Sequence, residues 1–345
     1  MSELRTDPIA GHVVIVAENR AVRPDEFAHA GKSPGGARSD ASATCPFCAG
    51  NEHLTPHSVA EYSIPTSDDA WQVRVVPNKY PAVDAGADTA STNRLDVQPP
   101  SGCKLAPGIG RHEVIVESPR HLLRLTDLDG DQIALVFRAY RDRLSTAARE
   151  DGLAYGLVFK NQGPAAGATL EHLHSQFMAL PIVPLDVARE LQLGLETLRR
   201  TGRCATCALV DQELATRKRI VAETPEFVVL CPFASRLPYE TWIVPRAHEP
   251  RFDFCGDELS QRLAQIVREV LLRLESRLNR PDYNYLLRSA PFDTRTSDHY
   301  HWRMEILPRT TRLAGFEWGS GCFINPVAPE RGAAELRSLA EAPTD

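Results

Sequence analysis

The sequence has no uninterrupted apolar run of about 18 residues, the length that a membrane-spanning helix requires. It also has no excess of positive charge, because its 39 lysines and arginines are outnumbered by 45 aspartates and glutamates, which gives a net charge of −6. This balance argues against a nucleic acid or an anionic membrane as a partner, but it allows a local basic pocket for a small phosphate. Residues 1–20 contain no long apolar segment with a cleavage site. We therefore expect no secretory signal and a cytoplasmic protein.

What the sequence does have is ordinary globular composition and an unusual arrangement of cysteines. Its 345 residues suggest two domains, and 43% apolar residues provide for a sizeable core. Four of the eight cysteines form two CxxC pairs, Cys45/Cys48 and Cys204/Cys207. In a reducing compartment, such pairs indicate metal ligands or redox pairs rather than disulfides. The other four are expected to pack inertly: Cys103, Cys231, Cys255 and Cys322.

The spacing of the motifs indicates an internal duplication. The CxxC pairs are 159 positions apart (204 − 45), and the strand-like runs EVIVESPRH and ETWIVPRAH each end in a histidine, His121 and His248. His172 follows the first of these by 51 positions (172 − 121), and His299 follows the second by 51 (299 − 248). We therefore predict two copies of one unit.

Each copy combines several strands with one long helix. Strands are predicted near 71–76, 112–117, 155–160 and 172–179 in the first copy, and near 226–231, 239–244, 283–288 and 299–306 in the second. Helices are predicted over 127–150 and 257–278, with another around 185–200 between the copies and one more over 329–341. Strands gathered around one helix per copy indicate antiparallel sheets and an α+β fold.

Both CxxC pairs are candidates for zinc sites. Zinc takes four ligands in a tetrahedron, and a CxxC turn supplies two thiolates. In the first copy the repeat favours His121 and His172 as the other two ligands, while His53, His57 and His112 are alternatives closer in sequence. In the second copy His248 would be joined by either His299 or His301.

The stretch HLHSQ at 172–176 has the residues for phosphoryl chemistry. If His172 binds metal, strand alternation turns His174 and Gln176 to the same face. A neutral imidazole can attack phosphorus and form a phosphoramidate, which splits one displacement into two. A glutamine amide can hydrogen-bond a phosphoryl oxygen without ionising. The alternative interpretation of this stretch is a polar strand with a structural pair of histidines.

HLHSQ resembles the His-x-His-x-Gln motif of the galactose-1-phosphate uridylyltransferase family, a branch of the histidine-triad superfamily. CPFCAGNEHLTP resembles the cysteine loop of that family, VRVVPNKYPAV its nucleotide-binding strand and turn, and NQGPAAGATLEHLHSQ the approach to its active site. The resemblance extends over about residues 5–330. It implies a homodimer, and ping-pong transfer through a nucleotidyl-histidine. It also implies two tandem histidine-triad-like domains, each an antiparallel sheet with flanking helices, at 1–184 with the nucleophile and first zinc, and at 185–345 with the second zinc.

The resemblance also implies roles for individual residues. His174 matches the nucleophile, and Gln176 matches the glutamine that contacts phosphate. Asn161 and Thr169 match phosphate contacts, and the residues that match nucleotide or sugar-phosphate contacts are Asn78, Arg20 and Arg23. The implied zinc ligands are Cys45, Cys48, His121 and His172 in the first copy and Cys204, Cys207, His248 and His301 in the second. The ungapped repeat, by contrast, favours His299.

Departures from the family pattern leave the substrate open. Leu173 stands where uridylyltransferases commonly have proline, and Lys79 where they have aspartate. The stretch HWRMEILPRTTRLAGFEWGSGCFINPVAPE resembles the ADP-glucose phosphorylase branch, which uses phosphate as acceptor. The acceptor is thus a hexose 1-phosphate, as in a UDP-glucose–hexose-1-phosphate uridylyltransferase, or phosphate. The cations expected to bind a phosphate acceptor are Arg20, Arg23, Lys160 and Arg303.

Two further functions compete with nucleotidyl transfer. A histidine-triad nucleotide hydrolase would discharge the nucleotidyl-enzyme with water. Gln176 argues against it, because such hydrolases usually carry a third histidine at this place. A zinc-stabilised binding protein with a dead site is the other alternative, and the intact pair of His174 and Gln176 argues against that one.

Overall fold

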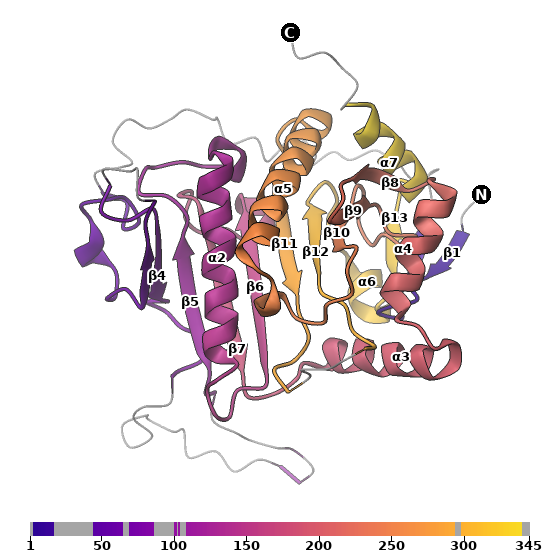
Figure 1. Cartoon of the computed structure of the whole chain (residues 1–345), viewed down its shortest axis with the longest axis horizontal. Coiled ribbons are helices and arrows are strands. Elements are labelled where there is room, and N and C mark those ends of the chain that lie inside the picture. Colours follow the sequence, from indigo (N-terminus) through magenta and orange to yellow (C-terminus); the bar gives the residue numbers. More distant parts are fainter. Residues whose placement is uncertain are drawn as a thin grey trace.

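The computed structural model describes residues 3–16, 44–64, 69–85, 100, 101, 103, 108–293 and 298–339. Its centre is one ten-stranded sheet in which every neighbouring pair of strands is antiparallel (Figure 1). The order across the sheet is β3 (Ala60–Tyr62), β4 (Val73–Pro77), β5 (Arg111–Val116), β7 (His174–Leu180), β6 (Tyr155–Gln162), β11 (Tyr283–Arg288), β12 (Arg303–Pro308), β10 (Thr241–Pro245), β9 (Phe227–Leu230) and β8 (Ile220–Glu223).

The sheet consists of two matching halves that meet at its middle. Outward from the centre, β6, β7, β5, β4 and β3 are mirrored by β11, β12, β10, β9 and β8, so each half of the chain supplies five strands. β6 and β11 pair across the junction, with Asn161 opposite Asn284. The predicted α+β class with antiparallel sheets is confirmed, but the prediction of a sheet for each domain is corrected. β6 and β11 would each be an edge strand if the halves were separate. Pairing them satisfies main-chain groups that would otherwise be unpaired, and so joins the halves into one sheet.

Two long helices cover one face of this sheet and lie beside each other. They are α2 (Gly130–Ala147) in the first half and α5 (Asp257–Leu278) in the second (Figure 1). α2 begins where the Asp129 side chain accepts a 2.8 Å hydrogen bond from the main-chain N–H of Gln132, as expected at a helix N-terminus. Apolar residues three and four positions apart, such as Ile133, Val136 and Tyr140, turn toward the sheet and join the main core.

The remaining elements flank the second half. α3 (Leu185–Thr201) confirms the helix predicted around 185–200, and α4 (Ala205–Thr216) follows it. A small sheet contains β1 (Glu3–Thr6), β2 (Val13–Val16) and β13 (Phe323–Asn325), with α6 (Gly315–Ser320) and α7 (Pro329–Ser338) near it. Short 3-10 turns are η2 (Glu52–Leu54), η3 (Leu125–Asp127), η4 (Pro164–Ala166) and η5 (Phe252–Phe254).

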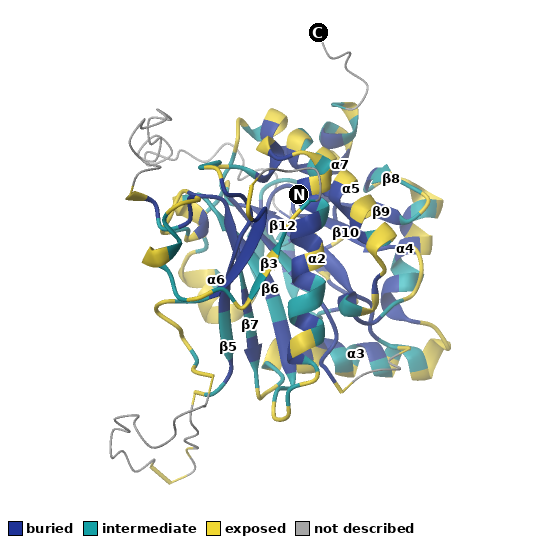
Figure 2. Cartoon of the chain, turned by 60° about the vertical axis from the view of Figure 1, so that its left-hand side comes forward, coloured by how far each residue is buried: buried dark blue, intermediate teal, exposed yellow. Residues whose placement is uncertain are grey.

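Burial follows this layering. The central strands of the large sheet and the inner faces of α2 and α5 are largely buried, whereas β1 and the edge strand β3 are more exposed. Other exposed residues are concentrated on the outer faces of the helices and in the connections (Figure 2). Across the part of the chain that the structure describes, no helix is both long enough and apolar enough to span a membrane.

Candidate functional site

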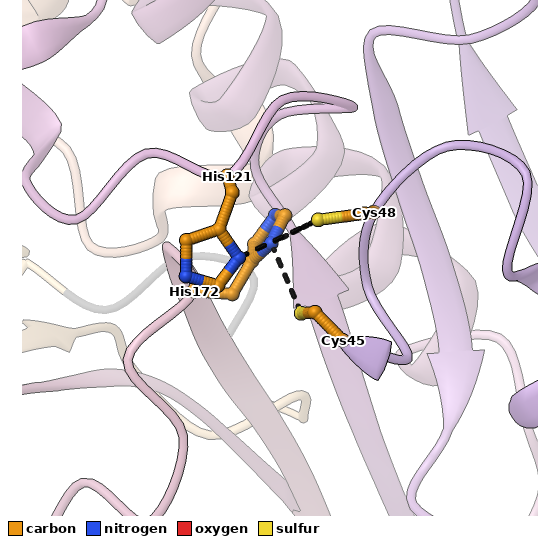
Figure 3. A group of neighbouring side chains, drawn as sticks. All are labelled: Cys45, Cys48, His121 and His172. Carbon is orange, nitrogen blue, oxygen red and sulfur yellow. Dashed lines mark hydrogen bonds between the residues drawn. The ribbon is translucent and has the colours of Figure 1, made fainter. Parts of the chain in front are cut away.

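Four side chains from separate parts of the first half converge on one point. Cys45 and Cys48 lie on the turn before η2, His121 follows β5, and His172 precedes β7 (Figure 3). The Cys45 sulfur is 3.4 Å from Nδ1 of His172, and the Cys48 sulfur is 3.4 Å from Nδ1 of His121. These separations are close to the sulfur–nitrogen distance of about 3.5 Å in a tetrahedral site with zinc–sulfur and zinc–nitrogen bonds of about 2.3 and 2.0 Å. The four residues thus form a ligand set suited to zinc.

His172 is held for metal binding by its other ring nitrogen. Its Nε2–H donates a 2.9 Å hydrogen bond to the main-chain carbonyl of Ser118, which leaves Nδ1 with a lone pair directed at the two sulfurs. Burial lowers the pKa of His172 to about 4, so the ring is neutral at physiological pH. Its plane stands nearly perpendicular to that of His121, at 89°.

The second half contains a matching cluster. Cys204, Cys207, His248 and His301 place their ligand atoms within 4.8 Å of one another. The Cys207 sulfur lies 3.4 Å from Nδ1 of both His248 and His301. Among the described residues these two clusters are the ones suited to hold a metal, and His53, His57 and His112 belong to neither.

The second cluster contains a different histidine from the one that the ungapped repeat predicted. His301, as implied by the family resemblance, belongs to the cluster, and His299 does not. In the first half Phe159 pairs with Gln176, 17 positions on, whereas in the second half Leu286 pairs with Glu305, 19 positions on. The connection between the paired strands is therefore two residues longer in the second half. A repeat that assumes equal spacing in both halves therefore selects His299, two residues before the actual cluster member His301.

His174 is the first residue of β7, and one hydrogen bond fixes the orientation of its ring. Its Nδ1–H donates a 2.7 Å hydrogen bond to the main-chain carbonyl of His172. The proton therefore resides on Nδ1, and Nε2 keeps its lone pair. Burial lowers the pKa of His174, so the ring stays neutral at physiological pH. A neutral imidazole with an available Nε2 can attack phosphorus.

A buried ion pair lies behind this histidine. The Lys160 ammonium donates to the Glu117 carboxylate at 2.6 Å and to the main-chain carbonyl of His174 at 2.8 Å. Tyr140 donates to the same carboxylate at 2.8 Å and also contacts the hydroxyl of Tyr285. This network ties β7 to β5, β6 and β11, so His174 stands on a cross-linked support. The sequence alone did not identify Glu117, whose position at the end of the EVIVE run is its one signal.

Two pockets meet at His174. One, of 470 Å³, is lined by Phe47, Asn78, Tyr80 and Gln176 among others, and we call it the Asn78 pocket. The other, of 330 Å³, is lined by residues that include Asn161, Glu171 and Asp282, and we call it the Asn161 pocket. Thr169, Leu170 and His174 line both pockets. The structure thus brings His174 together with four residues predicted from the sequence, Gln176, Asn78, Asn161 and Thr169.

Of the predicted phosphate-binding cations that the structure describes, Lys160 lines the Asn161 pocket and Arg303 lines neither pocket. Arg20 and Arg23 lie outside the described residues. Lys160 is 1% exposed and its ammonium is engaged by Glu117, which corrects its expected role. Arg303 is also 1% exposed, is bound by Glu190 and Glu305, and is not among the described residues that line either pocket. A buried cation with carboxylate partners stabilises its surroundings and is not available to a ligand.

The chain was compared with known families and proteins. The family model described as galactose-1-phosphate uridyl transferase, N-terminal domain, matches residues 1–184, and a model of a domain of unknown function matches residues 133–339. ADP-glucose phosphorylase from Arabidopsis thaliana is 36% identical over 98% of this chain and 93% of its own length. Galactose-1-phosphate uridylyltransferase from Thermotoga maritima is 26% identical over 98% of each chain.

Solved structures of an ADP-glucose phosphorylase and a uridylyltransferase are also similar to this chain. A crystal structure of an Arabidopsis thaliana ADP-glucose phosphorylase with bound ADP-glucose superposes with a TM-score of 0.82 at 34% identity, covering 98% of this chain and 99% of the other. A uridylyltransferase structure superposes with a TM-score of 0.73 at 28% identity, covering 99% of both chains. These relatives share the fold over its whole length.

Proposed function

This chain belongs to the galactose-1-phosphate uridylyltransferase family, an enzyme family of nucleotidyltransferase type, and we propose that it transfers the nucleotidyl group of a nucleotide sugar through a covalent bond to His174. The observation that carries this proposal is the hydrogen bond from Nδ1 of His174 to the main-chain carbonyl of His172. It leaves Nε2 as the reactive nitrogen of a residue that lines both pockets.

The first step is attack of the Nε2 lone pair of His174 on the α-phosphorus. A nitrogen–phosphorus bond forms, the bond from phosphorus to the bridging oxygen breaks, and the sugar 1-phosphate leaves with that oxygen. No proton leaves the ring, because Nδ1–H remains bonded to the carbonyl of His172 and stabilises the cationic, substituted imidazole. In the second step an acceptor oxygen attacks the same phosphorus and the nitrogen–phosphorus bond breaks, which restores the free histidine.

The pockets divide the substrate between them. The Asn78 pocket, with Phe47 and Tyr80 in its lining, suits the nucleoside, because a base packs well against aromatic rings. The Asn161 pocket would take the sugar phosphate that leaves and the acceptor that replaces it, because Arg124, Asn161 and Thr169 offer donors for phosphate oxygens and the carboxylates of Glu171 and Asp282 can accept from sugar hydroxyls. Gln176 would donate from its amide to a non-bridging oxygen, where negative charge develops in the transition state.

We propose zinc at both Cys2His2 clusters. Soft thiolates with imidazoles at tetrahedral separations favour zinc over magnesium or calcium. Four protein ligands leave no open coordination position, so the ion would supply structural support rather than Lewis acidity. In the first cluster that support reaches the nucleophile, because the carbonyl of the ligand His172 fixes the ring of His174.

For the acceptor we propose orthophosphate, which would make the enzyme an ADP-glucose phosphorylase. Identity to the plant ADP-glucose phosphorylase is 36%, against 26% to the bacterial uridylyltransferase. The higher TM-score of the phosphorylase structure, 0.82 against 0.73, supports the same choice. Uridylyl transfer between hexose 1-phosphates is the second candidate.

Two measurements test the proposal. Intact-mass spectrometry after mixing the protein with ADP-glucose or UDP-glucose should show a nucleotidyl adduct, which peptide mapping should place on His174. The enzyme should then be given ADP-glucose with phosphate, and UDP-glucose with galactose 1-phosphate. Rapid ADP release supports the phosphorylase, whereas UDP-galactose formation without reaction on phosphate would establish the uridylyltransferase. Absence of any adduct would overturn covalent transfer.

From the resemblance we also propose a homodimer whose domains divide at 184/185, between β7 and α3, and from the sequence we propose a cytoplasmic location. Reduced cysteines in both clusters support the cytoplasm as the compartment. Light scattering coupled to gel filtration would measure the oligomeric state, and a single mass of one chain would contradict the dimer.

A further inference from the structure

His112 stands between the two groups expected to contact the nucleotide. It lies on β5, the strand next to β7, and its Nε2 is 2.9 Å from Oε1 of Gln176. On the other side of the ring, the main-chain N–H of Ala82 donates to Nδ1 at 3.0 Å. The ring therefore connects Gln176 to the turn that follows β4, which carries Asn78 and Tyr80 into the Asn78 pocket.

These contacts determine where the proton of His112 resides. A main-chain N–H can only donate, so Nδ1 must accept from Ala82 with a lone pair. A neutral histidine then has its proton on Nε2, which donates to Gln176. The atom of Gln176 that receives this bond must be its carbonyl oxygen, because an amide nitrogen does not accept. The amide N–H groups of Gln176 are thereby left to face a ligand.

Asn78 is oriented by the same logic. Its Oδ1 accepts the main-chain N–H of Tyr80 at 2.9 Å, so its amide nitrogen is the atom near His112, 3.1 Å from Nε2. The single N–H on Nε2 is used by Gln176, and Asn78 therefore keeps its own amide hydrogens for a ligand in the pocket that it lines. Both amides thus present donors, which is the polarity that a phosphate or ribose oxygen requires.

We propose that His112 is a positioning residue that holds the carbonyl oxygen of Gln176 and so aims its amide donors at the phosphoryl group. A glutamine amide can otherwise turn over with little change in shape, and the turned form would direct its carbonyl oxygen at phosphoryl oxygens and repel them. His112 acts through Gln176 and contacts neither the nucleophile nor phosphorus. This inference rests on the proposed nucleotidyl transfer through His174.

Substitutions at His112 can separate its two bonds. In His112→Asn the shorter amide can accept from Ala82 but does not reach Gln176, while in His112→Gln the longer amide can donate to Gln176 from near the Nε2 position. Both would be compared with Gln176→Ala and with the double variant His112→Asn/Gln176→Ala. His53→Phe, at an exposed position on η2, is the control. The measured quantities are the single-turnover rate of adduct formation from saturating ADP-glucose, its KM, and the melting temperature.

The expected pattern is a loss in rate with little change in KM. Gln176→Ala should be slower by about 100-fold or more, as for loss of a transition-state donor, and His112→Asn by about 10- to 100-fold, as for loss of a group that orients one. The double variant should be no slower than Gln176→Ala, and His112→Gln should recover most of the rate. If the two losses multiply in the double variant, or if His112→Asn reacts at the wild-type rate, the proposal is wrong.

The controls distinguish failure of the His112 proposal from failure of the nucleotidyl-transfer proposal on which it rests. A wild-type protein that forms no adduct overturns the transfer and this inference with it, whereas a wild-type adduct with an unaffected His112→Asn variant overturns this inference alone. If His112→Asn lowers the melting temperature by several degrees, His112→Phe, which keeps the ring shape without its nitrogens, replaces it in the same cycle. His53→Phe should match the wild type in every measurement.

Discussion

β7 and β12 occupy corresponding places in the two halves of the sheet, and each begins two residues after a histidine of a Cys2His2 cluster. β7 starts with His174, the proposed nucleophile, and β12 starts with Arg303. Two positions farther on, Gln176 of β7 corresponds to Glu305 of β12. The halves therefore share a framework and differ in the residues that this framework presents.

The second half replaces the reactive groups by ion pairs. Arg303 is 2.5 Å from Glu190 of α3 and 2.7 Å from Glu305, and Arg236 lies 2.7 Å from the other oxygen of Glu305. Burial alone would raise the pKa of Glu305, but the cations Arg288, Arg303 and Arg236 outweigh it and lower this pKa, so the carboxylate is ionised at physiological pH. The second cluster therefore stands beside ion pairs rather than beside a histidine and a glutamine, which favours a structural role for it.

The largest effect should come from exchanging the nucleophile. His174→Asn removes the reactive nitrogen, so turnover should fall by at least about 10⁴-fold, as it does when nucleophiles are removed from other covalent enzymes. Metal content and melting temperature should stay near those of the wild type, because His174 is not a cluster ligand. A variant that turns over nucleotide sugar at the wild-type rate would exclude covalent catalysis at this residue.

Loss of one metal should distinguish the two clusters. We expect about two zinc ions per chain by elemental analysis, and about one in Cys45→Ser or Cys204→Ser, with a lower melting temperature in both. Cys45→Ser should also slow adduct formation per folded molecule, because His172 orients His174. Cys204→Ser should leave that rate nearly unchanged. Metal content that does not fall in Cys204→Ser would contradict the second site, and equal loss of rate in both variants would contradict the division of roles.

Exchanging Arg303 should have the opposite effect from exchanging His174, because stability should fall while the rate is retained. Arg303→Met leaves the carboxylates of Glu190 and Glu305 buried without this cation, so the free energy of unfolding should drop by about 3–5 kcal/mol. Urea denaturation would measure the loss. The rate of adduct formation by the folded fraction should be retained, since Arg303 is not among the described residues that line the pockets. A specific loss of rate at unchanged stability would show that the second half contributes to the reaction.

These comparisons also show what the sequence could and could not predict. Periodicity located the strands that cross the core, as in the prediction of 283–288 for β11 (Tyr283–Arg288). It missed β3 and β8, which are edge strands of three and four residues, too short for a clear alternation. The HLHSQ pattern and the family resemblance predicted His174 and Gln176 and the members of both clusters, and the structure brings the members of each cluster together.

The roles of charged groups depend on partners far away in the chain and could therefore not be predicted from the sequence. Lys160 looked available for phosphate, but Glu117, 43 positions earlier, engages it, and the partner of Arg303 lies 113 positions away in Glu190. The same limit applies to His112, whose contact with Gln176 spans 64 positions. Sequence spacing reports neighbours on one element, whereas these assignments require the register of neighbouring strands.

The smallest expected effect concerns the two helices that cover the sheet. α2 is preceded by Asp129, whose side chain accepts the Gln132 N–H, whereas α5 is preceded by Gly256, which has no side chain for this bond. Asp129→Ala should lower the free energy of unfolding by about 1 kcal/mol, and Gly256→Ser should raise it by a few tenths of a kcal/mol. Gly256 has an extended backbone, with φ at −76°, and a Cβ built there meets nothing within 4 Å, so serine fits without strain. Urea denaturation of both variants would compare them. If Gly256→Ser destabilises the protein instead, the start of α5 needs glycine for a reason other than capping, and the two helices differ by more than one hydrogen bond.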